Sequence, residues 1–489
     1  MSFNSIQFLV FFPVVTFLYF ALPFRLRWAM LLIASSIFYM AFIPAYILIL
    51  FFTITVDYLA GRLIYKTQGK RRRLYLTASI AANLGVLGFF KYFDFIGSNL
   101  TLAAHALGWK YSLPVLSLVI PIGLSFHTFQ AMSYTIEIYR GNQRPEKHFG
   151  IFALYVMFYP QLVAGPIERP QNLLHQFYER HCFEYQRVVG GLKLMLWGMF
   201  KKIVIADRLA VFVDQVYNHP TSYQGIPLIV ATLFFAFQIY CDFSAYSDIA
   251  IGAAQVMGFR LMTNFNRPYG AKSIADFWRR WHISLTTWLR DYVYLPLIGN
   301  HGPRQALYAS IFITFLISGI WHGARWTFVV WGALNGLYIL TSIWTRNIRR
   351  AICNIFELER VPRFHAALQI AVTFSLTCFA WVFFRANSLS DAYYIVRNLF
   401  TGTGYFLTHL GLRETWANIL PGQQPSDILI AVIPIIFMWL IHLIQPHHSI
   451  RNMFSEKPIF FRWAMYYALL LSIICFGAFE ARQFIYFQF

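Results

Sequence analysis

Long apolar runs separated by short polar stretches dominate the chain. A helix needs about 20 mostly apolar residues to cross the hydrocarbon core of a bilayer. On this pattern we expect helices near residues 5–23, 28–44, 45–64, 74–97, 114–139, 187–212, 227–257, 305–320, 326–345, 366–384, 427–445 and 463–480. The pattern predicts an all-α polytopic integral membrane protein. We find neither an internal repeat nor a linker, and therefore expect a single transmembrane domain over residues 1–489.

One apolar stretch is too broken to be a single spanning helix. Residues 149–186 contain Pro160, Gly165, Pro166 and Pro170 at close spacing, and proline interrupts helices. Irregular backbone survives at membrane depth only where protein buries it or where it lines a watery cavity. We therefore predict a re-entrant or half-inserted segment here.

Residues 273–300 have the pattern of an amphipathic helix in or near the membrane interface. Ser273 and Asp276 form a pattern typical of a helix start, and Asp276 can pair with Arg280 one turn later. Three tryptophans suit an interfacial position: Trp278, Trp281 and Trp288.

Composition supports the membrane assignment and narrows the partners. Of the 489 residues, 58% are hydrophobic and only 12% are charged, about half the charged fraction of a soluble domain. The net charge of +20 comes from short clusters between apolar runs and not from one basic stripe. Such clusters are typical of cytoplasmic loops, so we expect contact with lipid and not with nucleic acid.

The positions of the basic clusters predict the orientation of the chain. They lie near residues 25–27, 66–73, 140–147, 346–363 and 447–462. Alternating crossings place all of them on one side, which the positive-inside bias makes cytoplasmic. The first apolar run lacks a basic region before it and a cleavage site after it, so we expect a retained helix. The N-terminus, the stretch 385–427 and the C-terminal tail are then expected outside.

The five cysteines are scattered and never form a C-x-x-C pair. They are expected to be small buried hydrophobic residues, with no metal site. Nucleotide-binding glycine motifs, a G-x-S-x-G elbow and an H-E-x-x-H zinc motif are also missing from the sequence. We therefore expect no permanently bound cofactor.

His282 and His322 lie in aromatic-rich apolar segments, where an ionisable side chain is costly. On a continuous helix, His282 would share a face with Trp278 and Thr286, and the Thr286 hydroxyl could orient the imidazole. The alternative is an interfacial histidine whose ring reaches toward the membrane surface.

His322 follows Ser318-Gly319 and precedes Gly323. Small neighbours allow a substrate or another backbone to approach closely. A neutral histidine buried there is suited to general-base catalysis. The alternative is a core histidine that is hydrogen-bonded to a backbone carbonyl.

Asp242, Ser244, Ser247 and Asp248 are polar positions inside another apolar segment. They could line a cavity or form interhelical hydrogen bonds, and the second is the commoner case.

Taken together, these segments resemble the membrane-bound O-acyltransferase (MBOAT) family, in its bacterial branch of alginate and peptidoglycan O-acetyltransferases. The resemblance covers essentially the whole chain. It rests on Pro121–Gln130, Pro160–Arg169, Gln238–Asp248, Asn264–Tyr269, Phe277–Leu285, Trp321–Ala324 and Phe484–Phe489.

The resemblance implies a fold, a reaction and site residues. The fold would be a ring of roughly 11–13 transmembrane and re-entrant helices around a central tunnel, in a bacterial inner membrane. His322 would be the catalytic base, and His282 would help position or polarise the thioester. Acetyl-CoA would supply the acetyl group from the cytoplasm, and an extracytoplasmic SGNH-type partner would pass it to a polysaccharide such as alginate or peptidoglycan.

The resemblance also implies a role for the aromatic C-terminus, where Tyr486 would be an acyl relay. A phenol with a pKa near ~10 is a poor nucleophile at neutral pH and would need a base such as a histidine. The alternative is that Phe484, Tyr486 and Phe489 form an interfacial aromatic anchor.

A function from another class is a transporter or channel component of a polysaccharide export complex, with no chemistry of its own. Intramembrane His and Asp residues occur in such proteins as well. Many transporters carry internal repeats, which this sequence lacks.

Overall fold

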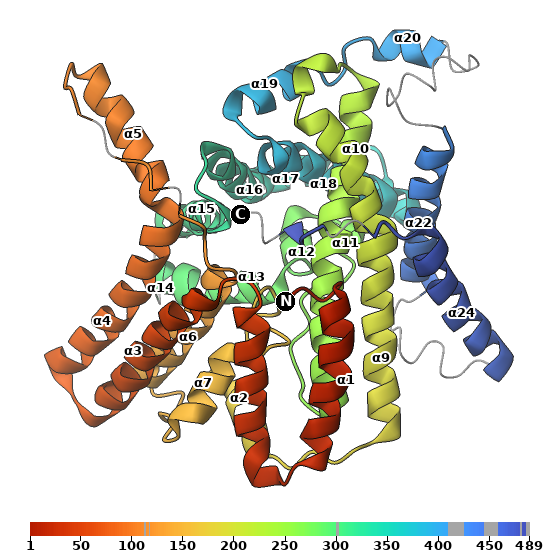
Figure 1. Cartoon of the computed structure of the whole chain (residues 1–489). Helices are drawn as coiled ribbons and strands as arrows, with labels where there is room; N and C mark the ends of the chain where they lie inside the picture. Colours follow the sequence, from red (N-terminus) through yellow and green to blue (C-terminus); the bar gives the residue numbers. More distant parts are fainter. Residues whose placement is uncertain are drawn as a thin grey trace. The chain divides into compact units, whose positions relative to one another are not determined.

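The computed structural model describes residues 1–111, 114–116, 118–299, 303–408, 425–444, 458–479 and 482–485 (Figure 1). Backbone contacts divide the chain into two interleaved units. Unit 1 comprises Met1–Met195, Tyr246–Thr263 and Tyr486–Phe489, and unit 2 comprises Leu196–Ala245 and Asn264–Ile485. Two helices contribute residues to both units: α9 (Tyr185–Met199) and α11 (Ile226–Met257).

The other long helices of unit 1 lie on the predicted apolar runs, except that the run 74–97 is divided between two helices and the second of them extends to Ala106. They are α1 (Ile6–Ala21), α2 (Phe24–Met40), α3 (Ile47–Lys66), α4 (Gly69–Leu87), α5 (Phe93–Ala106) and α6 (Leu124–Arg140). Helices α3, α4 and α6 pack against one another. Gly61 allows α6 to come close, because a Cβ there would lie 2.8 Å from Tyr134 Cε1.

A buried polar cluster joins these three helices. The Ser79 hydroxyl donates to Asp57 Oδ1 over 2.6 Å and lies 3.1 Å from Thr135 Oγ1. The Asn83 amide donates to both oxygens of Asp57, at 3.0 and 2.9 Å. These bonds satisfy polar groups in apolar surroundings and fix the register of the helices.

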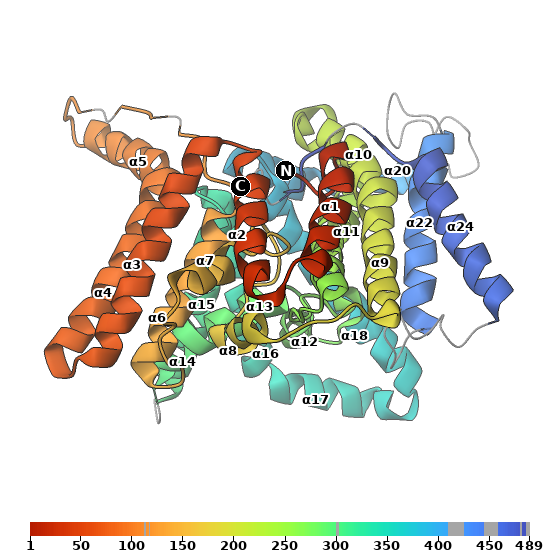
Figure 2. The ribbon, with the colours of Figure 1, turned by 60° about the horizontal axis from the view of Figure 1, so that its bottom comes forward.

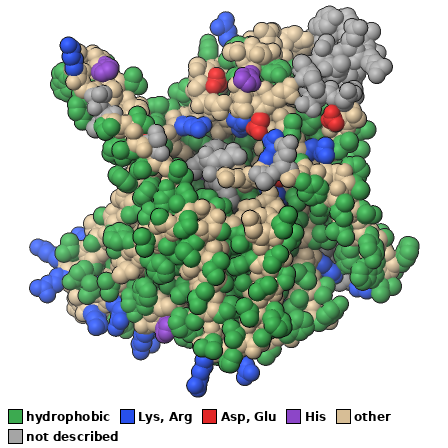
Figure 3. Space-filling model, viewed as in Figure 1, with side chains coloured by type: hydrophobic (Ala, Val, Ile, Leu, Met, Phe, Trp, Pro, Cys, Tyr) green, Lys and Arg blue, Asp and Glu red, His purple; other side chains and the backbone are tan. Residues whose placement is uncertain are grey.

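Basic side chains gather at one end of the unit 1 helices, where α1 meets α2 and α3 meets α4 (Figures 1 and 3). Arg72 near the start of α4 donates to the carbonyl oxygen of Tyr139 near the end of α6, over 2.5 Å. The clusters at 66–73 and 140–147 therefore lie at the same end of these helices, as the predicted orientation requires.

The broken stretch 149–186 begins with α7 (Phe149–Met157) and reaches α8 (Pro170–Leu173) through irregular backbone. Residues 158–168 are buried throughout. Tyr155 Oη donates to the carbonyl oxygen of Glu168 over 2.9 Å, and Glu168 Oε1 accepts the N–H of Met262 over 2.6 Å. Protein buries this irregular backbone, which is one of the two settings that the sequence allowed, and its re-entrant placement in a membrane stays a prediction.

Unit 2 begins at Leu196 within α9, which a π-helical turn, η4 (Phe200–Ala206), continues into α10 (Asp207–Tyr217). The helices of unit 2 after residue 303 are α15 (Arg304–His322), α16 (Trp326–Trp344), α17 (Arg346–Ile355), α18 (Pro362–Arg385), α19 (Leu389–Asn398), α20 (Thr403–Thr408), α22 (Pro425–Ile444) and α24 (Ile459–Phe476). Helices α15 and α16 form a tight hairpin. A Cβ on Gly319 would lie 2.3 Å from the carbonyl oxygen of Phe328, so the small residue permits this approach.

Eight helical stretches in the described part of the chain are long and apolar enough to cross a membrane, which confirms the predicted fold class. They are Pro44–Lys66, Gly69–Ala106, Ile226–Met257, Arg304–His322, Trp326–Trp344, Pro362–Arg385, Ser426–Leu443 and Ile459–Phe476.

One other predicted boundary was wrong, and one predicted loop contains a helix. The run 114–139 becomes helical only at Leu124, after Pro121 and a left-handed Gly123 (φ 78°). The predicted basic loop at 346–363 contains the amphipathic helix α17, which runs across the end of α16 (Figure 2).

Candidate active site

The segment that carries His282 is broken just before this residue. Helix α12 (Ile274–Trp278) begins as predicted, because Ser273 Oγ accepts the N–H of Asp276 over 3.1 Å. The predicted ion pair also forms, with Arg280 Nη2 2.9 Å from Asp276 Oδ2. The helix ends at Trp278, however, and His282 has left-handed backbone (φ 43°) before α13 (Ile283–Leu289).

The prediction of one continuous helix over 273–300 was therefore wrong, and the cause is a tertiary contact. Backbone atoms of the 264–266 segment pair with the break: the N–H of Ile283 donates to Asn264 O and the N–H of Asn266 donates to Arg280 O, both over 2.9 Å. These bonds replace helical bonds at the turn and hold His282 in place.

Asn264 also fixes the ring of His282. Its Oδ1 lies 3.1 Å from His282 Nδ1 and accepts the N–H of Ser284 over 3.2 Å and the Ser284 hydroxyl over 2.9 Å. An amide oxygen only accepts hydrogen bonds, so Nδ1 must carry the proton and Nε2 the lone pair. The sequence analysis missed Asn264 as a site residue, although the stretch that begins with it was part of the family resemblance.

The expected partner of His282 was wrong. The Thr286 hydroxyl donates to the carbonyl oxygen of Trp281 over 3.2 Å. The interfacial alternative for His282 also fails, because the residue has no exposed surface. Burial lowers the pKa of His282 well below its usual value, which keeps the ring neutral. The three tryptophans predicted at the interface are likewise buried, at 6%, 1% and 4% exposure for Trp278, Trp281 and Trp288.

His322 is the last residue of α15 and is 3% exposed. Its ring packs against Trp321, Trp331 and Phe384, with centroid distances of 4.9, 5.0 and 5.2 Å. Gly323 is required beside it, because a Cβ there would lie 2.2 Å from Phe328 Cε2. The small neighbours thus admit another side chain and the α16 backbone, which is one of the two uses that the sequence suggested.

One aromatic cluster contains both histidines. The Trp321 ring centroid lies 6.0 Å from that of His282 and 4.9 Å from that of His322. A second path runs from Trp281 through Trp381 to Trp331, with ring centroids 5.1 and 5.8 Å apart. Residues 40 positions apart in sequence therefore share a dry aromatic surrounding, in which hydrogen bonds and charges act strongly.

A cavity of about 180 Å³ lies beside this cluster, between α13 and α15. Ser318, one turn before His322 on α15, and Trp278 are among its lining residues. Trp278 in turn packs against Trp331, with centroids 5.6 Å apart. Arg290 also contributes to the lining, while its guanidinium pairs with Asp291, 2.8 Å away.

Two of the four polar positions of α11, Asp242 and Ser244, form interhelical bonds, the commoner of the two uses that the sequence suggested. Lys202 Nζ donates to Asp242 Oδ1 over 2.6 Å, and Lys201 Nζ donates to Ser244 Oγ over 2.7 Å. Within the described residues, His, Cys, Asp and Glu side chains form no group of three or more that could hold a metal ion.

The C-terminal aromatic motif is only partly described. Phe484 is 1% exposed, and Lys202 Nζ lies 4.4 Å from its ring centroid. The aromatic-anchor alternative is therefore wrong for Phe484, which is buried in unit 2. Tyr486 and Phe489 lie outside the described residues, so the role of Tyr486 stays a prediction.

The fold and the site define an all-helical polytopic membrane protein with a neutral histidine held in a dry aromatic interior. The sequence comparisons then specify the family. The family model described as "MBOAT, membrane-bound O-acyltransferase family" matches residues 143–386. The chain belongs to this family and is an O-acyltransferase.

Individual relatives are similar over most of the chain. The chain is 37% identical over 446 residues to a "Probable alginate O-acetylase AlgI" of Pseudomonas aeruginosa, covering 90% of this chain and 82% of the relative. It is 36% identical over 409 residues to a "Peptidoglycan O-acetyltransferase" of Helicobacter pylori, covering 78% and 75%. A "Teichoic acid D-alanyltransferase" of Bacillus subtilis is 23% identical over 289 residues, covering 56% and 71%.

Proposed function

We propose that this protein transfers an acetyl group from cytoplasmic acetyl-CoA across the bacterial inner membrane, for O-acetylation of an extracytoplasmic polysaccharide such as alginate or peptidoglycan. Support for acetyl transfer to a cell-surface polymer comes from relatives named as alginate O-acetylases and as a peptidoglycan O-acetyltransferase. The observation that carries the chemistry is the pair His282 and His322, buried in one aromatic cluster.

His322 is the proposed general base. An attacking hydroxyl forms a C–O bond to the thioester carbonyl carbon while His322 takes the hydroxyl proton. The C–S bond then breaks, and the coenzyme A thiolate leaves and receives a proton. An unprotonated imidazole suits the first step because its free nitrogen can accept the hydroxyl proton.

His282 is the proposed positioning residue. With Nδ1–H directed at Asn264, its Nε2 can accept a hydrogen bond but cannot donate one. Polarising the thioester carbonyl, the role implied by the resemblance, would need a protonated ring, and burial opposes that charge. The attacking hydroxyl has one proton, which His322 takes, so His282 is better suited to position the thioester donor through a hydrogen bond accepted at Nε2.

Tyr486 is the proposed first acceptor. Its phenol oxygen attacks the thioester, which gives an acetyl ester on Tyr486 and free coenzyme A. A hydroxyl of an extracytoplasmic SGNH-type partner then attacks the aryl ester and carries the acetyl group to the polysaccharide. A phenolate is a better leaving group than an alkoxide, so this relay runs downhill toward a sugar ester.

The proposed orientation follows from charge. The end of unit 1 that carries the clusters at 66–73 and 140–147 faces the cytoplasm, where acetyl-CoA is made available, and the N-terminus and C-terminal tail face outside. Residues 1–489 are proposed to act as one domain, since the chemistry needs both the donor side and the acceptor side of the membrane.

Release of free coenzyme A thiol tests the proposal. Purified protein with its extracytoplasmic partner is given acetyl-CoA, and thiol release is measured for wild type and for His322→Ala and His322→Gln. Both variants are expected to lose at least ~10²-fold in rate, the usual size of a general-base contribution. Retained thiol release in either variant, with normal protein level and elution from a sizing column, would show that His322 is not the base.

Tyr486→Phe tests whether Tyr486 carries the acetyl group between coenzyme A and the partner. The variant is expected to lose acetyl transfer to the partner and to lose the burst of thiol release that loads the tyrosine. Mass spectrometry of the C-terminal peptide should show an acetyl group in wild type and none in the variant. Wild-type transfer in Tyr486→Phe would exclude the relay.

Uptake of acetyl-CoA or polymer without thiol release would instead favour a transporter.

A further inference from the structure

A fully buried ion cluster lies in unit 2, outside the histidine site. Lys202 Nζ, in the π-helical turn η4, lies 2.6 Å from Asp242 Oδ1 on α11 and 2.7 Å from Asp207 Oδ1 at the start of α10. The three side chains are at most 5% exposed. Charges buried so deeply cost free energy unless each is paired, and even paired they stabilise a fold little. Their presence in an apolar protein therefore indicates a role other than stability.

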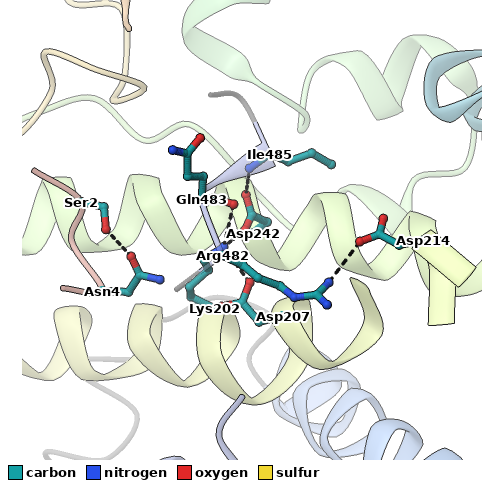
Figure 4. Close-up of polar contacts among 9 residues, drawn as sticks. All are labelled: Ser2, Asn4, Lys202, Asp207, Asp214, Asp242, Arg482, Gln483 and Ile485. Atoms are coloured by element: carbon teal, nitrogen blue, oxygen red, sulfur yellow. Dashed lines mark hydrogen bonds and ion pairs between the residues drawn. The ribbon is translucent and has the colours of Figure 1, made fainter. Parts of the chain in front are cut away.

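The same cluster holds the end of the chain (Figure 4). The N–H of Ile485 donates to Asp242 Oδ2 over 2.7 Å, and Lys202 Nζ donates to the carbonyl oxygen of Gln483 over 3.4 Å. Lys202 Nζ also lies 4.4 Å from the ring centroid of Phe484, where a cation is attracted to the aromatic face. Asp242 thus uses one oxygen for the lysine and the other for the tail.

A second, more exposed attachment lies a few residues earlier. Arg482 Nη1 is 3.1 Å from Asp214 Oδ2 on α10 (Figure 4). The other oxygen of Asp214 binds Arg385 of α18 at 2.7 Å. Phe484 and Ile485, which follow Arg482 closely in the chain, are buried, at 1% and 5% exposure. The segment 482–485 is therefore held by side-chain charges, backbone bonds and burial together.

We propose that Lys202, Asp207 and Asp242 form a tail clamp, a positioning site that docks residues 482–485. Tyr486 is bonded directly to Ile485, and consecutive Cα atoms are only about 3.8 Å apart. Docking of Ile485 therefore restricts the positions that an acetyl group carried on Tyr486 can reach. The second part of this inference, a role in acyl transfer, rests on the proposed function, whereas docking of the tail does not.

Reactivity of a buried cysteine in the tail tests the clamp directly. In a protein whose native cysteines (Cys182, Cys241, Cys353, Cys378 and Cys475) are replaced by alanine or serine, Ile485→Cys places a thiol at the docked position and keeps the backbone N–H. The rate of its reaction with a maleimide is measured in the detergent-purified full chain. Slow labelling reports a docked tail, and fast labelling reports a released one.

Lys201 provides a matched control for Lys202. Both lysines lie in η4 and are at most 3% exposed, but Lys201 donates to Ser244 Oγ, whereas Lys202 donates to the carbonyl oxygen of Gln483 in the tail. We expect Lys202→Met and Asp242→Leu to raise the labelling rate at least ~10-fold. Lys202→Met leaves Asp207 and Asp242 buried without their cation, and Asp242→Leu removes the acceptor of the Ile485 N–H. Lys201→Met should label as slowly as the parent, and Lys202→Arg should restore most of the protection.

A surface variant covers the case in which loss of Lys202 prevents folding. Arg482 is 27% exposed, so Arg482→Gln should leave the fold intact and raise labelling at least ~3-fold by removing one attachment. Equal labelling in the parent, Arg482→Gln and whichever of the buried variants folds would overturn the clamp.

Activity of the same variants separates the two proposals. Released tails are expected to lower acetyl transfer to the partner while the KM for acetyl-CoA stays unchanged. His322→Ala, which fails in catalysis, should label as slowly as the parent. Faster labelling with full transfer activity would leave the clamp in place and exclude its role in a Tyr486 relay.

Discussion

Replacing Asn264 by Asp changes one charge at the candidate site and keeps its hydrogen bonds. A carboxylate oxygen can still accept from His282 Nδ1, Ser284 N and Ser284 Oγ, which lie 3.1, 3.2 and 2.9 Å from the present Oδ1. The three donors help to keep the new aspartate ionised. The substitution is almost isosteric, so the backbone pairing of the 264–266 segment with the break at His282 should persist.

The magnitude follows from the distance between the new charge and the ring. A negative charge within 4–6 Å favours the protonated imidazole and raises its pKa by about 1–3 units. One unit corresponds to ~1.4 kcal/mol. In the parent, burial keeps the pKa of His282 well below its usual value, so the ring is neutral throughout the working range. If Nε2 must be unprotonated to accept a hydrogen bond, activity is lost as pH falls through the pKa of the ring, and the raised pKa moves that loss to higher pH.

The measurement is the pH dependence of thiol release from acetyl-CoA, between pH 5 and 9, for wild type, Asn264→Asp and Asn264→Ala. We expect the acid limb of Asn264→Asp to lie at least one unit higher, with activity approaching wild type at alkaline pH. Asn264→Ala removes the acceptor that fixes the tautomer and should lose about tenfold at every pH. An unshifted acid limb in a folded Asn264→Asp protein would refute the assigned tautomer and the role of Nε2.

Three changes test the packing. Gly319→Ala sets a methyl group 2.3 Å from Phe328 O and should lower the midpoint of thermal unfolding. Gly85→Ala, with nothing within 4 Å of the new Cβ, should leave the midpoint unchanged. Equal midpoints for the two variants, measured by size-exclusion after heating, would contradict the close approach. Asn83→Leu leaves Asp57 with fewer donors and should cost about 1–3 kcal/mol, seen as a lower midpoint than for Leu84→Ala beside it. Ser273→Ala removes a cap worth about 1 kcal/mol that Ser273→Thr should retain.

Local pattern predicted part of the site. The sequence identified His282 and His322 from their cost in an apolar setting, and it identified the α12 start from Ser273 and Asp276. It expected Thr286 as the partner of His282, because a helical repeat was assumed across residues 279–282. The actual partner, Asn264, is 18 residues away in the sequence. The sequence analysis included it only in the stretch Asn264–Tyr269, on which the family resemblance partly rests.

The sequence by itself determined the membrane class, the approximate helices and the end of unit 1 that is basic. Hydropathy and charge act over single turns or single crossings, so they can be read without knowing which helix meets which. Only the tertiary structure decided that the helix breaks before His282, that Trp321 contacts both histidines, and that Lys202 reaches Gln483, which is 281 positions further along the chain. These features depend on hydrogen bonds and packing between distant segments, and in an apolar interior such contacts outweigh local helix preference because an unmet polar group there is costly.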